Sequence, residues 1–259
     1  MNQKKRSDRQ YDTDSRRREQ TENLLPAAAL RAAPEGEMDR RGSGRAPQES
    51  TQKGVVIEMS VLIGICGEEY CLLFGDTRRV RYEGGQVRVT DDQSQNIFRV
   101  NDRVLFGMTG LLAGTEALFA PLRGFRDKEA ITLRLAVRAA GDYLRRSMGS
   151  LPGPTCCVAV GSDNKGRFRA CEIAGDPATG QVETAERSPE PPGSPWGITC
   201  ILPPGLAGER ERCLEQIKAC AARAGSPEEL AEQVCSLIRN MAKRDPAVGK
   251  AINVYMISK

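Results

Sequence analysis

The sequence predicts an α+β fold, a four-layer αββα sandwich with two stacked antiparallel sheets and helices on both outer faces. Two observations predict it. Apolar segments typical of strands come in hairpin pairs, and two pairs of segments with a helical period near 3.6 separate them along the chain. The resulting order is strands, two helices, strands, two helices, strand. Helix pairs inserted between antiparallel hairpins can cover the outer faces of two sheets, so this order favours the sandwich.

The chain divides by composition into an N-terminal extension and one folded domain. Residues 1–53 mix charged and polar side chains with proline and contain one short apolar patch. Such a segment cannot bury enough apolar surface to offset the entropy of ordering, so we expect it to be disordered. The folded domain is expected to span residues 54–259.

The first strands are expected in two hairpins. Residues 60–66 and 70–75 are apolar segments joined by Gly-Glu-Glu, and residues 96–100 and 103–110 form the second pair around an Asn-Asp turn. The intervening residues, 80–95, are polar and contain glycine. They are interpreted as a loop that includes at most an edge strand.

The helical segments follow in two pairs. Residues 111–122 are apolar enough for a buried helix, and residues 128–148 have an apolar stripe. The second pair comprises residues 207–223 and a helix that begins after Ser226. Ser226 is a predicted N-cap, with Pro227 at the first helical position and Glu229 completing a capping box. The stripe of the 128–148 helix is predicted to contain Ile131, Leu135, Ala139 and Leu144, and the last helix to bury Leu230, Val234, Leu237, Ile238 and Met241.

Four further strands complete the expected fold. Residues 155–161 and 167–174 flank a Ser-Asp-Asn-Lys-Gly turn, which predicts another hairpin. A short strand at 198–202 follows a proline-rich loop. The last strand is expected at 251–258.

Composition excludes several classes of function. The 38 basic and 34 acidic residues leave a net charge of +4, and only 5% of residues are aromatic, which argues against nucleic-acid binding. The chain has no histidine and no Cys-x-x-Cys pair, so a Ser-His-Asp triad is excluded and neither a metal site nor a cofactor is expected. The apolar segments are too short to span a membrane. Nine cysteines, mostly in apolar segments, are typical of reduced thiols in the cytoplasm and nucleus.

Ser60 opens the first strand, with Asp76 and Arg78 just after the second. A hydroxyl near a carboxylate and a guanidinium is one arrangement for nucleophilic catalysis. The residues alone leave another interpretation open: Ser60 can be an ordinary strand-entry serine, and Asp76 and Arg78 a structural ion pair.

Three segments carry a resemblance to a known family. They are GDTRRV at 75–80, NIFRVNDRVLFGMTGLLAGTEAL at 96–118 and AKRDPAVGKAINVYMI at 242–257. In this order on these elements they resemble the proteasome beta-type subunits, which are N-terminal-nucleophile hydrolases, over residues 60–257. The second and third segments look most like the type-3 beta subunit, a non-catalytic member of its ring.

The resemblance aligns Ser60 with the catalytic threonine of active members. There the chain cuts itself after a glycine, and the freed α-amine serves as base for the threonine hydroxyl. In this sequence Met59 precedes Ser60 in place of that glycine. Asp76 and Arg78 match the family's next acidic and basic positions.

The remaining catalytic positions are altered. Asn96 stands where the family has its catalytic lysine, and an uncharged amide cannot favour ionisation as an ammonium group does. Asp245 matches a family aspartate, but Val248 replaces a serine of active members. No catalytic residue is therefore expected, and Ser60, Asp76, Arg78, Asn96 and Asp245 are interpreted as positions of a degenerate site.

The resemblance implies a non-catalytic structural beta subunit of the 20S proteasome core particle, which acts in ubiquitin- and ATP-dependent protein degradation. Its expected partners are the other beta and alpha subunits in stacked seven-membered rings, without nucleic acid or membrane. The alternative is an active threonine- or serine-type endopeptidase subunit with Ser60 as its N-terminal nucleophile. These two hypotheses differ in whether the mature chain begins at Ser60.

Overall fold

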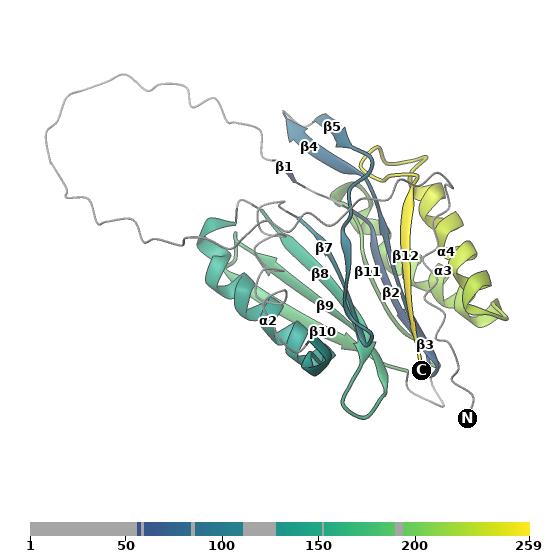
Figure 1. Ribbon diagram of the computed structural model, residues 1–259. Helices are drawn as coiled ribbons and strands as arrows, with labels where there is room; N and C mark the ends of the chain where they lie inside the picture. Colours follow the sequence, from purple (N-terminus) through teal and green to yellow (C-terminus); the bar gives the residue numbers. More distant parts are fainter. Residues whose placement is uncertain (1–55, 58–59, 84–85, 111–127, 152, 190–193) are drawn as a thin grey trace, which may run out of the picture. The chain divides into compact units, whose positions relative to one another are not determined.

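Two antiparallel sheets stacked face to face form the centre of the structure (Figure 1). It is a computed structural model, and the residues it describes belong to one compact unit. The N-terminal extension predicted to be disordered, Met59 and the helix predicted at 111–122 lie outside the described residues. The structure describes residues 56–57, 60–83, 86–110, 128–151, 153–189 and 194–259.

The first sheet has four strands in the order β11-β2-β3-β12, and every neighbouring pair is antiparallel. The hairpin predicted at its centre is present, with Cys66 opposite Cys71 next to the turn. The C-terminal strand lies along the outer side of β3. The strands are β2 (Leu62–Cys66), β3 (Tyr70–Asp76), β11 (Gly197–Ile201) and β12 (Ile252–Ser258).

The second sheet has five antiparallel strands in the order β10-β9-β8-β7-β6, so each strand pairs with the next along the sequence. The strand β10 was not predicted, because its mostly exposed residues give little hydrophobic contrast. The strands are β6 (Ile97–Asn101), β7 (Val104–Thr109), β8 (Thr155–Ser162), β9 (Phe168–Asp176) and β10 (Gln181–Arg187).

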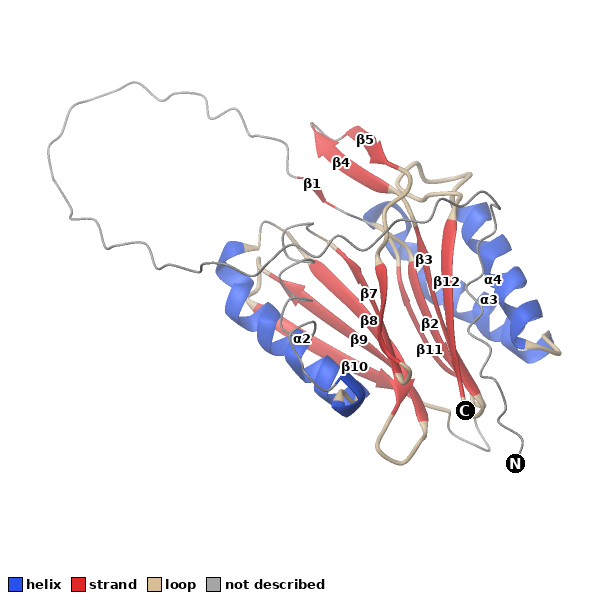
Figure 2. Cartoon of the chain, viewed as in Figure 1, coloured by secondary structure: helices blue, strands red, loops and turns tan. Residues whose placement is uncertain are grey.

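Helices cover both outer faces, which confirms the predicted sandwich (Figure 2). Helix α2 (Leu133–Ser147) packs on the five-stranded sheet, and α3 (Arg210–Arg223) and α4 (Pro227–Met241) pack on the four-stranded sheet. Among the described helices, none is long and apolar enough to span a bilayer. The core between the sheets includes Leu62, Leu73, Ile97, Leu105, Val158 and Val160, all with no exposed surface.

The helix boundaries follow their capping residues. Ser226 Oγ accepts a hydrogen bond from the Glu229 N–H at 3.1 Å, which confirms Ser226 as the N-cap of α4. Helix α2 begins later than predicted, because Thr132 caps it through the Leu135 N–H. The buried face of α2 also differs from the predicted stripe: Leu144 is buried as expected, whereas Leu135 and Ala139 are only half-buried. The buried residues of α2 are Leu133, Ala136, Ala140, Gly141 and Leu144.

A small third sheet stands where a loop with at most an edge strand was expected. Its order is β1-β4-β5, with β1 (Val56–Ile57), β4 (Arg79–Glu83) and β5 (Gln86–Asp91). Strand β4 begins just after Asp76, at the end of β3. Strand β1, which pairs with β4, ends three residues before Ser60. The third sheet therefore adjoins the Ser60 position.

Three short 3₁₀ turns lie next to two of the helices. One precedes α3, where the sequence predicted an α-helix from residue 207, and the others flank α2. The turns are Lys128–Ala130, Met148–Ser150 and Pro204–Glu209.

Candidate functional site

Ser60 lies at the entry to β2, and only 4% of its surface is exposed. Its backbone N–H donates a hydrogen bond of 2.7 Å to the Oγ1 of Thr109, the last residue of β7. Because β2 and β7 belong to different sheets, this bond joins the two sheets at their ends. No described residue hydrogen-bonds to the Ser60 hydroxyl.

Asp76 ends β3, and its carboxyl group is fully buried. Its Oδ1 accepts a hydrogen bond from the Val61 N–H at 2.6 Å, and Oδ2 accepts one from the Gly249 N–H at 2.6 Å. The Arg78 N–H lies 3.4 Å from the same Oδ2. Burial raises the pKa of Asp76 from 3.8 to about 7, although these N–H donors and the charge of Arg78 act to lower it.

Asn96 precedes β6 and is 2% exposed. Its Nδ2 donates a hydrogen bond of 2.7 Å to the Asp76 carbonyl oxygen, whereas its Oδ1 has no partner among the described residues. Gly75 makes room for this side chain, because a Cβ at Gly75 would lie 2.6 Å from the Asn96 Oδ1. Asn96 is therefore packed against the end of β3 and holds its backbone.

Arg78 pairs with a residue that the sequence analysis did not single out. Its Nε and Nη2 lie 2.6 and 3.2 Å from the two carboxylate oxygens of Asp92. Its Nη1 donates a hydrogen bond of 3.0 Å to the Pro246 carbonyl oxygen. The structural ion pair considered for Asp76 and Arg78 is thus formed by Arg78 and Asp92, and the third bond ties Arg78 to the turn that contains Asp245.

Asp245 lies in the turn between α4 and β12. Its Oδ1 accepts a hydrogen bond from the Ala247 N–H at 2.8 Å, and its carbonyl oxygen accepts one from the Val248 N–H. Both bonds stay within the turn. Asp245 makes no hydrogen bond with Ser60 or Asp76, so its carboxylate shapes the turn that presents the Gly249 N–H.

The structure brings Ser60, Asp76 and Asn96 together into one network at the ends of β2, β3 and β7, in which Asp76 accepts hydrogen bonds from Asn96 and from Val61, the residue after Ser60. Thr109 and Gly249 complete it, and sequence patterns did not identify either residue. Both residues lie within the segments that resemble the proteasome beta-type subunits, and this resemblance was the sequence signal that could have identified them. No described lysine contacts this network through a hydrogen bond or ion pair, and no described group of His, Cys, Asp and Glu residues could hold a metal ion.

A comparison with solved structures identifies the architecture. The chain matches the crystal structure of eukaryotic HslV from Trypanosoma brucei with a TM-score of 0.50 and 16% sequence identity. The match covers 77% of this chain and 99% of that one. The chain has the HslV fold.

The HslV fold is the proteasome-like fold of the N-terminal-nucleophile hydrolases, so the predicted fold class is confirmed. No family model matches the sequence, and no curated protein is significantly similar to it. At 16% identity the likeness concerns the fold.

Proposed function

We propose that this protein is a non-catalytic beta-type subunit that builds the wall of a proteasome-like protease particle. The observation that carries the proposal is the network around Ser60. The Ser60 N–H donates to Thr109, and Met59 stands in place of the glycine after which active members cut, so the chain lacks the residue that releases the α-amine needed as base for the hydroxyl.

The environment of Asp76 supports the same conclusion. A lysine at the position of Asn96 would carry a charged ammonium group, but the Asn96 side chain is an uncharged amide that donates its hydrogen bond to the Asp76 carbonyl oxygen rather than to the carboxylate. The carboxylate oxygens instead accept backbone N–H groups of Val61 and Gly249. This arrangement uses the acid to hold the turn between α4 and β12, and leaves it no role in activating a hydroxyl.

A subunit without catalytic activity contributes to a particle through its contacts with the other subunits. We propose that its partners are other beta and alpha subunits in stacked seven-membered rings, that the particle is the 20S core of ubiquitin- and ATP-dependent degradation, and that it acts in the cytoplasm and nucleus. The likeness of the fold to HslV, together with the proteasome-like segments of the sequence, supports this proposal.

The test is purification of the full chain from its native cell through a C-terminal tag. We expect a particle many times the mass of the 28.2 kDa chain, which contains other beta-type and alpha-type subunits. A protein that elutes alone as a monomer would contradict the proposed assembly.

Catalysis is tested separately by two serine variants of the particle. Ser60→Ala should leave every peptidase activity of the particle unchanged, as should the control Ser94→Ala, which removes another buried serine. Intact-mass measurement should detect no chain that begins at Ser60. The catalytic alternative would be established if Ser60→Ala, but not the control Ser94→Ala, lost one peptidase activity. A chain that starts at Ser60 would establish it as well.

A further inference from the structure

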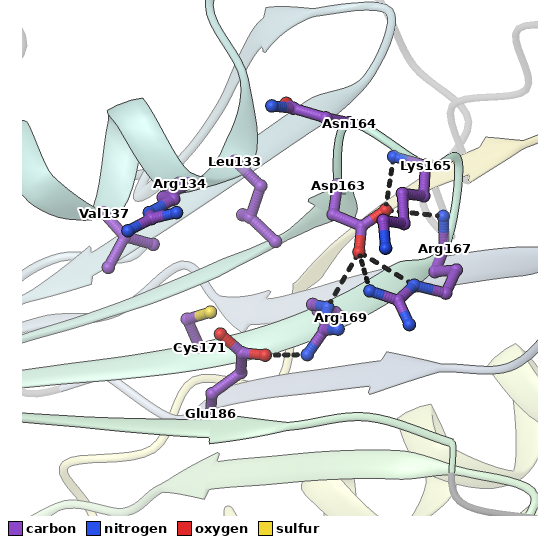
Figure 3. Close-up of a pocket in the computed structure, with 10 residues that line it drawn as sticks. All are labelled: Leu133, Arg134, Val137, Asp163, Asn164, Lys165, Arg167, Arg169, Cys171 and Glu186. Carbon is purple, nitrogen blue, oxygen red and sulfur yellow. Dashed lines mark hydrogen bonds and ion pairs between the residues drawn. The ribbon is translucent and has the colours of Figure 1, made fainter.

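A cavity of about 510 Å³ lies between α2 and the turn that joins β8 to β9 (Figure 3), and Ser60 is not among the residues that line it. Helix α2 contributes its first turns to one side, and the other lining residues come from the turn, β9 and β10. A volume of this size suits a small organic molecule. The lining residues are Leu133, Arg134, Val137, Asp163, Asn164, Lys165, Arg167, Arg169, Cys171 and Glu186.

Part of the lining is apolar. Leu133 and Cys171 belong to the packed core between α2 and the five-stranded sheet, and Val137 is half-buried beside them. These side chains are held by neighbours on the helix and on the sheet, so the apolar part of the cavity is preformed. A ligand with a hydrocarbon portion could bury it there without rearranging the core.

Asp163 organises the charged side of the cavity. Its Oδ1 accepts hydrogen bonds from the N–H groups of Lys165 at 2.8 Å and Arg167 at 3.0 Å. Its Oδ2 lies 3.0 Å from Arg167 Nε and 3.2 Å from Arg169 Nε, and Arg169 also pairs with Glu186. The two acids are therefore engaged with the two arginines and fix the shape of the turn.

Two of the positively charged lining residues are not balanced by an acidic residue of the lining. The lining contains Arg134, Lys165, Arg167 and Arg169 against Asp163 and Glu186, a surplus of two positive charges. Within the described part of the chain, Arg134 and Lys165 have no ion pair or hydrogen bond through their side chains. The first turn of α2 has no acidic residue, so the positive end of the helix dipole adds to the same potential.

We propose that this cavity binds an organic anion, a carboxylate or phosphate group attached to an apolar body. Arg134 and Lys165 bind the anionic group through charge-assisted hydrogen bonds, and Leu133 and Val137 contact the apolar body. The proposal does not depend on the proposed function, since none of these residues belongs to the Ser60 network.

The test uses two anionic probes and one neutral probe on the full chain. Octyl phosphate and octanoate carry the two anionic groups on hydrocarbon chains, and octanol is the neutral match. By titration calorimetry at low salt, we expect at least one anion to bind with a dissociation constant below about 1 mM, and at least about tenfold more tightly than octanol. Which anion binds better distinguishes a phosphate from a carboxylate ligand.

Variants locate the binding. The double variant Arg134→Ala/Lys165→Ala should weaken binding of the preferred anion at least about tenfold. The control Arg138→Ala removes an arginine of the same helix, 80% exposed, that lies 3.8 Å from Asp142 and does not line the cavity; it should bind as the wild type does. Thermal unfolding of each variant verifies that it is folded.

Three results would overturn the proposal: no binding of either anion at millimolar concentration, equal binding of octanol, or undiminished binding by a folded double variant.

Discussion

The carboxylate of Asp76 accepts a hydrogen bond of 2.6 Å from the backbone N–H of Gly249, 173 residues further along the chain. The same carboxylate binds the Val61 N–H through its other oxygen. One buried side chain thus joins the entry to β2, the end of β3 and the turn before β12. Gly249 is required there, because a Cβ would lie 2.9 Å from the Arg78 Cβ and 3.1 Å from the Asp76 Oδ2.

Replacing Asp76 with alanine should destabilise the fold by about 2–4 kcal/mol, because it leaves buried N–H groups of Val61 and Gly249 without acceptors. The measurement is the free energy of unfolding in urea at pH 7. The control is Asp92→Ala, whose side chain is 56% exposed in its pair with Arg78 and should cost less than about 1 kcal/mol. Equal losses in the two variants would contradict this role of Asp76.

Asp76 should also make stability depend on pH. Burial raises its folded pKa to about 7 from 3.8, so between these values the folded protein holds a proton that the unfolded chain has released. The resulting stabilisation is fully present below about pH 4 and is lost as the pH rises toward 7. Its magnitude is on the order of 4 kcal/mol.

The variant Asp76→Asn, which cannot titrate, isolates this effect. Relative to it, the wild type should lose stability between pH 4 and 7 and then level off, and no histidine titrates in this range to obscure the difference. Unfolding free energies at several pH values measure the difference. A difference that does not change with pH would show that Asp76 has an ordinary pKa in the folded protein.

Replacing Asn96 with alanine should cost about 1–3 kcal/mol, because the Asp76 carbonyl oxygen loses the 2.7 Å hydrogen bond from Nδ2 in a buried site. The control Asn164→Ala changes an exposed asparagine and should have little effect. Urea unfolding distinguishes the two. An Asn96→Ala protein as stable as the wild type would mean that Asn96 contributes nothing through this bond.

Replacing Ser226 with alanine should destabilise α4 by about 1 kcal/mol, because the Glu229 N–H loses its acceptor. Ser236→Ala is a matched control: it is the same substitution at an exposed position inside the same helix, where alanine is tolerated. Thermal unfolding measures both. A larger loss in Ser236→Ala than in Ser226→Ala would be incompatible with capping by Ser226.

Much of the fold could be predicted from local patterns. Each strand of the β2 and β3 hairpin is a short apolar segment, and the Ser226, Pro227 and Glu229 sequence locates the start of α4, because these signals act within a few residues. The strands of the third sheet and β10 were missed. The side chains of β5 and β10 are largely exposed, so the sequences of these two strands lack the hydrophobic contrast that predicts a strand.

The sequence by itself determined the order of the main elements, the replacement of the family's glycine by Met59 and the replacement of its lysine by Asn96. The tertiary structure decided which groups meet. Arg78 binds Asp92 rather than Asp76, and Asp76 binds the Gly249 N–H. Such pairings join residues from 14 to 173 positions apart, and backbone N–H groups carry no sequence signal, so only the folded chain selects them.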